Sequence, residues 1–227
     1  MGSGCAAIIV AAGTAQRMQG IDKVMAPIDG EPMILRAVRA LAESALVNEI
    51  VIVTRSDLVQ SVKELCAAVE KLSAVVAGGA TRAESVAIGL DTISSELPFV
   101  AIHDGARPLV TVDVIDEAIT AAEKGGAAAP AIPLHDTVKV AQNSVVLDTP
   151  DRSTLYAVQT PQVFNTEAIR AALRMALEQG IVLTDDCSAA EAAGMQVILT
   201  QGSEENLKVT TPVDLILAEA ILCRREV

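Results

Sequence analysis

The sequence is poor in aromatic residues, in histidine and in closely spaced cysteines. Aromatic side chains make up 1% of its 227 residues, and it has two histidines and four cysteines. So few aromatics argue against the base-stacking platforms of proteins that bind single-stranded nucleic acid. The cysteines form no C-x-x-C pair, which argues against a zinc site and is typical of reduced thiols in a cytoplasmic protein.

Positive charge is also scarce. Lys and Arg number 17 against 29 Asp and Glu, which gives a formal net charge of −12. This balance argues against nucleic acid or an anionic membrane surface as a partner. No apolar run has the length of a membrane span, and the N-terminus lacks the basic region of a signal peptide. We therefore expect a cytoplasmic protein in which a few basic residues, gathered in loops, mark an anionic ligand.

Apolar segments are abundant, and those with strand character alternate with those of helical periodicity. Hydrophobic residues make up 51% of the chain. The β-α-β-α order predicts one α/β domain over residues 1–227, with a Rossmann-like, mainly parallel sheet flanked by helices. The expected strands are Cys5–Val10, Ile50–Thr54, Ala74–Ala77, Phe99–Ile102, Ala127–Ile132 and Gln196–Thr200. The expected helices cover 34–45, 58–69, 112–124, 166–179, 186–193 and 212–224, with another that starts at the T-x-x-E capping box of Thr81.

The alternation breaks at residues 133–158. Two β-like stretches, Thr137–Ala141 and Val145–Leu147, flank Gln142-Asn143-Ser144, and this spacing predicts a protruding β-hairpin arm. An isolated hairpin is marginally stable in water and usually packs on something. A second copy of the chain is the simplest partner, so we expect a homodimer that forms through this arm.

Small residues and cations follow the first strand. Ala11-Ala12-Gly13 opens a loop that also carries Arg17 and Lys23. Small residues let backbone N–H groups approach an anion closely, and the two cations add fixed positive charge. The loop fits neither G-x-x-x-x-G-K-[ST] nor G-x-G-x-x-G. It suits a nucleoside triphosphate, although an ordinary strand-to-helix turn with a surface arginine would have the same residues.

Similar motifs follow two later strands. Gly78-Gly79 precedes the helix expected at Thr81, whose N-terminus can receive an anion. Asp104 and Arg107 follow the fourth strand in H-D-G-A-R-P, and a carboxylate there is a candidate Mg²⁺ ligand. A turn or cap for Asp104 and a salt bridge for Arg107 are the alternatives. Because parallel strands present ligands at their carboxyl ends, the three loops predict one shared site.

Several longer motifs together carry a family resemblance. A-A-G-T-A-Q-R-M with the following Lys23 is similar to the signature loop of nucleotidyltransferases that activate sugars and polyols, although Ala15 stands where a second glycine is usual. The motifs H-D-G-A-R-P, D-R-S-T-L-Y-A-V-Q-T-P-Q, T-D-D-C-S-A-A-E and N-L-K-V-T-T-P resemble those of 2-C-methyl-D-erythritol 4-phosphate cytidylyltransferases, which act in non-mevalonate isoprenoid synthesis. The resemblance runs from Cys5 to Leu222.

The resemblance implies a fold, an activity and a set of site residues. The fold is glycosyltransferase-A-like, and the activity is Mg²⁺-dependent transfer of CMP from CTP to 2-C-methyl-D-erythritol 4-phosphate in a homodimer. The residues that would bind the cytidine or support it are Ala11, Ala12, Gly13, Gly79, Arg82 and Ser85. The cations that would serve catalysis are Arg17, Lys23, Arg152 and Lys208, with Asp104 near Mg²⁺ and the substrate. Those that would hold the acceptor are Arg107, Thr137, Arg152, Thr160, Thr184 and Lys208, and Arg152 would serve the neighbouring subunit's site.

Two other functions stay open at this point. A cytidylyltransferase for ribitol 5-phosphate or another polyol phosphate shares the fold and the loop. In such proteins, however, the loop more often begins with A-G-G than with the A-A-G of Ala11-Ala12-Gly13. A catalytically silent nucleotide-binding protein is the second, because Ala15 and Asp22-Lys23-Val24 depart from the family pattern. Elsewhere, His103 is interpreted as packing or bonding locally at a strand end and not as titrating in catalysis, and Asp185 and Asp186 as helix caps.

Overall fold

The computed structural model describes residues 4–13, 24–94 and 96–225. Arg17 and Lys23 lie outside these ranges. The strands are β1 Cys5–Ala11, β2 Pro27–Ile28, β3 Glu31–Pro32, β4 Val47–Thr54, β5 Leu72–Ala77, β6 Phe99–Asp104, β7 Ala127–Pro133, β8 Val140–Gln142, β9 Val145–Asp148, β10 Tyr156–Val158, β11 Gln162–Asn165 and β12 Ile198–Gln201. The helices are α1 Met33–Glu43, α2 Val59–Leu65, α3 Arg82–Thr92, α4 Val112–Gly125, α5 Thr166–Glu178, α6 Asp186–Ala192 and α7 Pro212–Arg225, with 3₁₀ turns η1 Ser56–Leu58 and η2 Arg152–Thr154. Within the described ranges, no helix has the length and apolar character needed to cross a bilayer.

One mixed sheet forms the centre of the fold. Its strand order is β10-β7-β11-β6-β1-β4-β5, and β12 pairs with β7. The neighbours β6, β1, β4 and β5 all run parallel, as do β12 and β7. β1 has the sequence C-A-A-I-I-V-A because a central parallel strand is covered on both faces and needs apolar side chains on each. The predicted, mainly parallel α/β sheet is confirmed.

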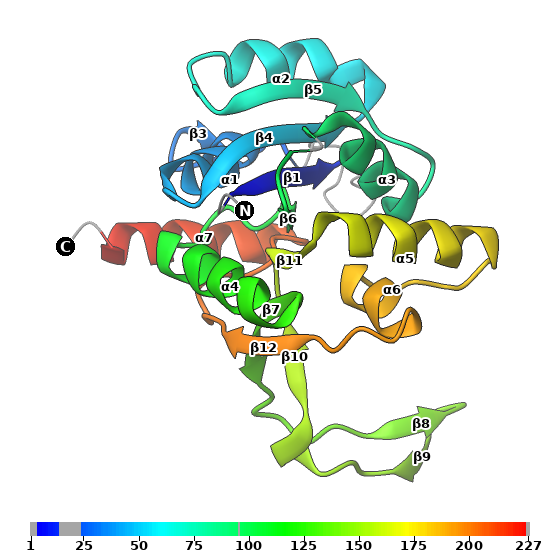
Figure 1. Ribbon diagram of the computed structural model, residues 1–227. Helices are drawn as coiled ribbons and strands as arrows, with labels where there is room; N and C mark the ends of the chain where they lie inside the picture. The colour runs from blue at the N-terminus through cyan, green and yellow to red at the C-terminus, as the bar shows by residue number, and fades with distance from the viewer. Residues whose placement is uncertain (1–3, 14–23, 95, 226–227) are drawn as a thin grey trace.

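Helices cover both faces of the sheet, as Figure 1 shows. Successive side chains of a strand point to opposite faces. Ile9 of β1 therefore packs in one core cluster with residues of α1 and α4, whereas Ile8 packs in another with residues of α3, α5 and α6. A third, smaller cluster joins Ala218 of α7 to Ile28 and Met33. This cluster brings the C-terminal segment alongside the residues that follow β6.

The short strand β11 is not predicted by the sequence pattern. It runs antiparallel between β6 and β7. Its four residues are too few to show an alternation, and its last residue, Asn165, already caps α5 by accepting a hydrogen bond from the Ala168 amide. The strand places Gln162 opposite Ile102, close to the end of β6.

The predicted hairpin is present at residues 140–148. β8 and β9 pair antiparallel, and Asn143 and Ser144 form the turn with φ of 48° and 64°. The turn has two residues where the sequence predicted three. Every residue of β8 and β9 is exposed. Figure 1 shows the hairpin projecting from the sheet beyond β7 and β10, and we call residues 133–158 the arm.

Candidate active site

The register of the central strands brings three loops to one edge of the sheet. Val10 at the end of β1 lies opposite Asp104 at the end of β6, and Ala11 lies opposite Thr54 at the end of β4. Thr54 in turn lies opposite Ala77, the last residue of β5. The loops after β1, β5 and β6 therefore start side by side, as the sequence predicted.

A cleft of about 590 Å³ opens at this edge. Its volume lies within the range of small-molecule sites. Among the residues predicted for the site, eight line it: Ala11, Ala12, Gly13, Gly79, Arg82, Ser85, Asp104 and Lys208. The sequence reasoning did not assign the other lining residues, which are Val10, Val24, Ala80, Thr81, Ala106 and Thr210. The expected shared site is therefore assembled from separate parts of the chain.

The turn after β5 has no room for side chains. A Cβ on Gly78 would lie 2.5 Å from the Ala12 Cβ and 2.7 Å from the Ser85 hydroxyl oxygen. The Gly79 amide donates a hydrogen bond to that hydroxyl over 3.2 Å, and the hydroxyl donates to the Thr81 carbonyl over 2.9 Å. Glycine at position 78 thus lets the turn pass close to the loop after β1, and Ser85 fixes the turn in place.

Helix α3 begins at the wall of the cleft. Thr81 caps it by accepting a hydrogen bond from the Glu84 amide over 3.1 Å. The Glu84 carboxylate accepts from the Ala80 amide over 2.7 Å, and not from the Thr81 amide as in a regular capping box. Because Thr81 and Arg82 line the cleft, the N-terminus of α3 lies at its wall, where the helix dipole favours an anionic ligand.

Asp104 lies between two cations. One carboxylate oxygen, Oδ1, is 3.2 Å from Nη2 of Arg82, and the other, Oδ2, is 2.6 Å from Nζ of Lys208. Burial by itself would raise the pKa of the Asp104 carboxyl, but the charges of Arg82 and Lys208 outweigh it and hold that pKa well below its usual range. Asp104 is therefore a permanent anion in the cleft wall.

Arg82 also binds a second carboxylate, that of Asp186. Nη1 and Nη2 of Arg82 donate to the two oxygens of Asp186 over 2.8 and 2.7 Å, which is a bidentate pair. Asp185 caps α6 through the Ser188 amide, as predicted, but Asp186 does not cap the helix. The prediction of a cap at Asp186 was wrong, because a sequence pattern cannot show a contact between residues 104 positions apart.

Comparison with known proteins identifies the family. A family model described as 2-C-methyl-D-erythritol 4-phosphate cytidylyltransferase matches residues 5–224. This chain belongs to that family. A protein of the same name from Caldanaerobacter subterraneus subsp. tengcongensis is 43% identical over 223 residues, which cover 95% of this chain and 97% of the relative. Another, from Symbiobacterium thermophilum, is also 43% identical and is covered over 91% of its length.

Solved structures similar to this cytidylyltransferase agree with the sequence relatives. The 4-diphosphocytidyl-2C-methyl-D-erythritol synthase of Anaerococcus prevotii has a TM-score of 0.87 at 29% identity, over 97% of this chain and 98% of that one. The cytidylyltransferase of Thermus thermophilus has a TM-score of 0.76 at 30% identity, over 95% and 97% of the two chains. None of these four proteins is named for ribitol phosphate, so the alternative acceptor gains no support from them.

In this cytidylyltransferase, hydrogen bonds that involve His103 and Thr160 fix the end of β6. The Thr160 hydroxyl oxygen accepts from the Asp104 amide and lies 3.1 Å from Nδ1 of His103, whose Nε2 lies 3.1 Å from the Arg107 carbonyl oxygen. Burial lowers the pKa of His103 to about 4. The ring is therefore neutral at pH 7, and the interpretation that His103 packs or bonds locally at a strand end is confirmed.

Of the predicted acceptor residues, Lys208 lines the cleft, and the others fall into two groups. Arg107 and Thr160 are close to the cleft but do not line it. Arg107 is largely buried, and its Nη1 donates to the Asn206 carbonyl oxygen over 2.5 Å. Burial lowers the pKa of the Arg107 guanidinium, and its buried Nε has no hydrogen-bond partner among the residues that the structure describes. That orphaned donor is the kind of group that a bound anion satisfies.

The other group lies away from the cleft within this one chain. Thr137 and Arg152 belong to the arm and are exposed, and Arg152 donates to the His135 carbonyl oxygen. Thr184 precedes α6, and its amide donates to the Ser188 hydroxyl. None of these three residues lines the cleft as the described part of the chain forms it.

The donors in the cleft fit a magnesium ion that is shared with a nucleotide. Across residues 4–13, 24–94 and 96–225, no group of three or more Asp, Glu, His and Cys side chains could hold a metal alone. Mg²⁺ is usually bound by one or two carboxylates together with substrate phosphates and water. Asp104, ionised and facing the cleft, supplies such a carboxylate.

Proposed function

We propose that this cytidylyltransferase transfers the cytidylyl group of CTP to 2-C-methyl-D-erythritol 4-phosphate, in the synthesis of isoprenoid precursors. The observation that carries the proposal is the cleft at the ends of β1, β5 and β6, in a chain whose family match runs from residue 5 to 224. A close-packed glycine turn, a helix N-terminus and a carboxylate between two cations form its wall. A helix N-terminus favours the phosphates of a nucleotide, and a carboxylate can hold Mg²⁺ together with them.

The chemistry needs positioning and charge more than proton transfer. An oxygen of the acceptor phosphate attacks the α-phosphorus of CTP and forms a new P–O bond. The bond to the bridging oxygen breaks, and its electron pair leaves with pyrophosphate. A phosphate monoester is already nucleophilic near neutral pH, so no strong base is required. The barrier lies in bringing two anions together, which fixed positive charge lowers.

The nucleotide would occupy the part of the cleft between the first loop and the glycine turn. Ala11, Ala12 and Gly13 would contact the cytidine, and Gly79 with Ser85 would recognise the edge of the base. Hydrogen-bond complementarity at such an edge rejects a poorly matched base. Arg17 and Lys23, which the family resemblance assigns to the triphosphate, would neutralise the charge that grows as the leaving group departs.

Asp104 would hold Mg²⁺ together with oxygens of the triphosphate. When bound, the ion neutralises charge on the departing pyrophosphate. Lys208, whose side chain is 44% exposed beside Asp104, would attract the acceptor phosphate. Arg107 and Thr184 would complete the acceptor site, and Thr160 would act through Asp104, whose amide its hydroxyl binds.

The rest of the acceptor site would come from a second copy. The arm exposes apolar side chains at Val145, Leu147 and Tyr156, which are 63%, 62% and 47% accessible. Such a surface is typical of an interface. A homodimer that forms through the arms would bring Thr137 and Arg152 of one subunit to the other's site. We place the enzyme in the cytoplasm, because its four cysteines are unpaired.

Pyrophosphate release from the purified protein tests the proposal. The reaction contains Mg²⁺ and CTP with either 2-C-methyl-D-erythritol 4-phosphate or ribitol 5-phosphate, and EDTA replaces Mg²⁺ in a parallel sample. We expect release with the first acceptor only, and none with EDTA. Release with ribitol 5-phosphate alone would overturn the proposed acceptor. CTP binding without pyrophosphate release with either acceptor in the presence of Mg²⁺ would indicate a catalytically silent nucleotide-binding protein.

A further inference from the structure

Asp186 is a buried carboxylate to which the reaction scheme above gives no task. Its side chain is 3% exposed, and both of its oxygens bind Arg82. Burying an ion pair removes the hydration of both charges, so such a pair contributes little net stability. Burial raises the pKa of the Asp186 carboxyl, and Arg82 opposes that shift. The pair therefore calls for an explanation in terms of what Arg82 does in the cleft.

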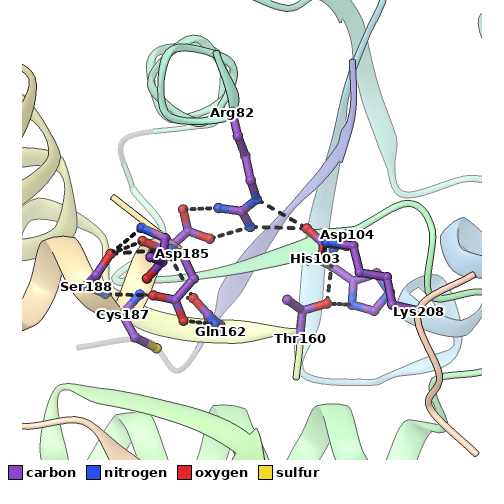
Figure 2. A network of polar contacts seen from close by, with 11 residues as sticks. Arg82, His103, Asp104, Thr160, Gln162, Asp185, Cys187, Ser188 and Lys208 are labelled. Atoms are coloured by element: carbon purple, nitrogen blue, oxygen red, sulfur yellow. Dashed lines mark hydrogen bonds and ion pairs between the residues drawn. The ribbon is translucent and has the colours of Figure 1, made fainter. Parts of the chain in front are cut away.

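The guanidinium of Arg82 is shared between two carboxylates. Nε and Nη2 lie 3.3 and 3.2 Å from Oδ1 of Asp104, whereas Nη1 and Nη2 bind Asp186 at 2.8 and 2.7 Å. Together with Lys208 these groups form a row of alternating charge, Lys208–Asp104–Arg82–Asp186. Figure 2 shows Arg82 reaching from α3 to a position between Asp104 on one side and the start of α6 on the other.

The two carboxylates are held by separate parts of the fold. Asp104 ends β6. The amides of Asp186 and Cys187 both donate to Oε1 of Gln162 on β11 over 3.0 Å, and Nε2 of Gln162 donates to Asp185 over 2.8 Å. Gln162 is 2% exposed and sits in the sheet next to β6. The sheet therefore sets the position of Asp186, and Asp186 sets the position of Arg82.

The distances show which carboxylate holds Arg82 more tightly. The contacts to Asp186 are shorter than those to Asp104 by several tenths of an ångström. Without the charge of Asp186, the guanidinium would lose its tighter partner and close onto Asp104. That movement would change the position of Arg82, which lines the cleft where the nucleotide is proposed to bind. It would also more fully neutralise the carboxylate that faces the ligand.

We propose that Asp186 is a positioning residue for the nucleotide: it draws Arg82 away from Asp104 and fixes the guanidinium in the cleft wall. Gln162 supports it by anchoring the start of α6 to β11. This inference rests on the proposed function in one respect, namely that the cleft beside Gly79 and Ser85 receives the nucleotide.

CTP binding by the full-length protein tests the proposal without turnover. Isothermal titration calorimetry is carried out with CTP and Mg²⁺ and without acceptor, on the wild type and on Asp186→Asn. The substitution removes the charge but keeps the size of the side chain and one acceptor oxygen. We expect CTP affinity to fall about tenfold, while the KM for 2-C-methyl-D-erythritol 4-phosphate changes less than about twofold. A purely structural defect would not separate the two substrates in this way.

Asp91→Asn is the matched control. It also removes one carboxylate from an arginine pair, because Asp91 accepts from Nη1 of Arg170 over 2.9 Å, but Asp91 neither lines the cleft nor takes part in the contacts of Arg82, Asp186 and Gln162. Its CTP affinity should stay within about twofold of the wild type. Equal losses in the two variants, or an unchanged affinity in Asp186→Asn, would overturn the proposal.

A second variant keeps the proposal testable if Asp186→Asn folds poorly. Arg82→Lys keeps the positive charge but cannot bind two carboxylates in the same planar geometry. We expect a similar loss of CTP affinity, and a double variant that is no weaker than the worse single one. Additive losses would show that Asp186 does not act through Arg82. A wild type that binds no CTP would instead overturn the proposed function, and this inference with it.

Discussion

The cleft and the arm are two predicted functional regions that the chain builds in opposite ways. At the cleft, Asp104 and Asp186 are at least nine-tenths buried, and each has charged partners from distant parts of the sequence. In the arm, every residue of β8 and β9 is exposed, including three consecutive apolar ones, Val145 to Leu147. A single chain thus fixes the geometry of the cleft, whereas the arm has its apolar surface still uncovered.

This difference predicts that the two substrates, CTP and the acceptor, differ in how many chains their binding requires. Those residues proposed for CTP that lie in the described ranges line the cleft, and one chain suffices to assemble them. Thr137 and Arg152, proposed for the acceptor, do not line the cleft that the described residues of their own chain form. Nucleotide binding should therefore survive in a monomer, whereas transfer to the acceptor should need two chains.

The largest effect is expected from Asp104→Asn. This change removes the proposed Mg²⁺ ligand and leaves Arg82 and Lys208 without their shared anion. We expect kcat to fall on the order of 10²-fold or more in steady-state assays of pyrophosphate release. Size-exclusion chromatography should show an unchanged oligomer, because the change lies in the cleft. A kcat within a few fold of the wild type would remove Asp104 from the proposed catalytic site.

A mixing experiment asks whether the arm serves the neighbouring site. Arg152→Ala and Asp104→Asn should each be nearly inactive alone. If Arg152 acts in the partner's cleft, a mixed dimer has one site with both residues intact, so an equal mixture should recover about a quarter of the wild-type activity. The control is Arg152→Ala mixed with a variant that carries both changes, which offers no intact site. No recovery after confirmed subunit exchange would place Arg152 in its own chain's site or in none.

The same contrast explains what the sequence could predict. The strands and helices of the core followed from their apolar periodicity. Eight of the residues predicted for the site line one cleft, most of them because parallel strands present their loops at one edge, and what each of them binds stays a prediction. The task of Asp186 was not predictable, since T-D-D before a helix has the pattern of a cap and its partner Arg82 is 104 positions away. β11 was missed because four residues carry too little pattern. The roles of Arg17 and Lys23 stay predictions, because these residues lie outside the described ranges.

The burial of His103 next to the cleft should also make the stability of the protein depend on pH. The pKa of His103 is lowered from 6.5 to about 4 in the folded protein. Between these values the unfolded chain binds a proton that the folded chain does not, so the free energy of unfolding should decrease as the pH falls through this window. The loss from one such group is about 3 kcal/mol in total. Urea titrations of the wild type and His103→Gln at several pH values measure it.

Only the difference between those two profiles belongs to His103. Asp104 lies beside it, but its lowered pKa contributes stability that is lost at more acidic pH, below the window. The variant should therefore lose less stability than the wild type between about pH 6.5 and 4. Parallel profiles would show that the ring is protonated in the folded state and would contradict its burial as a neutral group.

The smallest effect comes from making the same substitution in the buried core and in the exposed arm. Val51 in β4 is 0% exposed, and Val145 in β9 is 63% exposed. Val51→Thr buries a hydroxyl group in an apolar cluster and should lower the free energy of unfolding by about 1–3 kcal/mol at any protein concentration. Val145→Thr should change the stability of an isolated chain by less than about 0.5 kcal/mol, since the side chain is largely solvated.

The dependence on protein concentration shows how the effect of Val145→Thr on stability should be interpreted. If the arm forms the dimer, Val145→Thr weakens association, and its effect on the unfolding midpoint should appear at concentrations where the wild type is dimeric and vanish on dilution. Analytical ultracentrifugation over the same range fixes where that crossover lies. A loss at Val145 that is independent of concentration would mean that the arm is stabilised within its own chain. The cleft and the arm would then both be stabilised by contacts within one chain, and a second subunit would no longer be needed to explain the exposed hairpin.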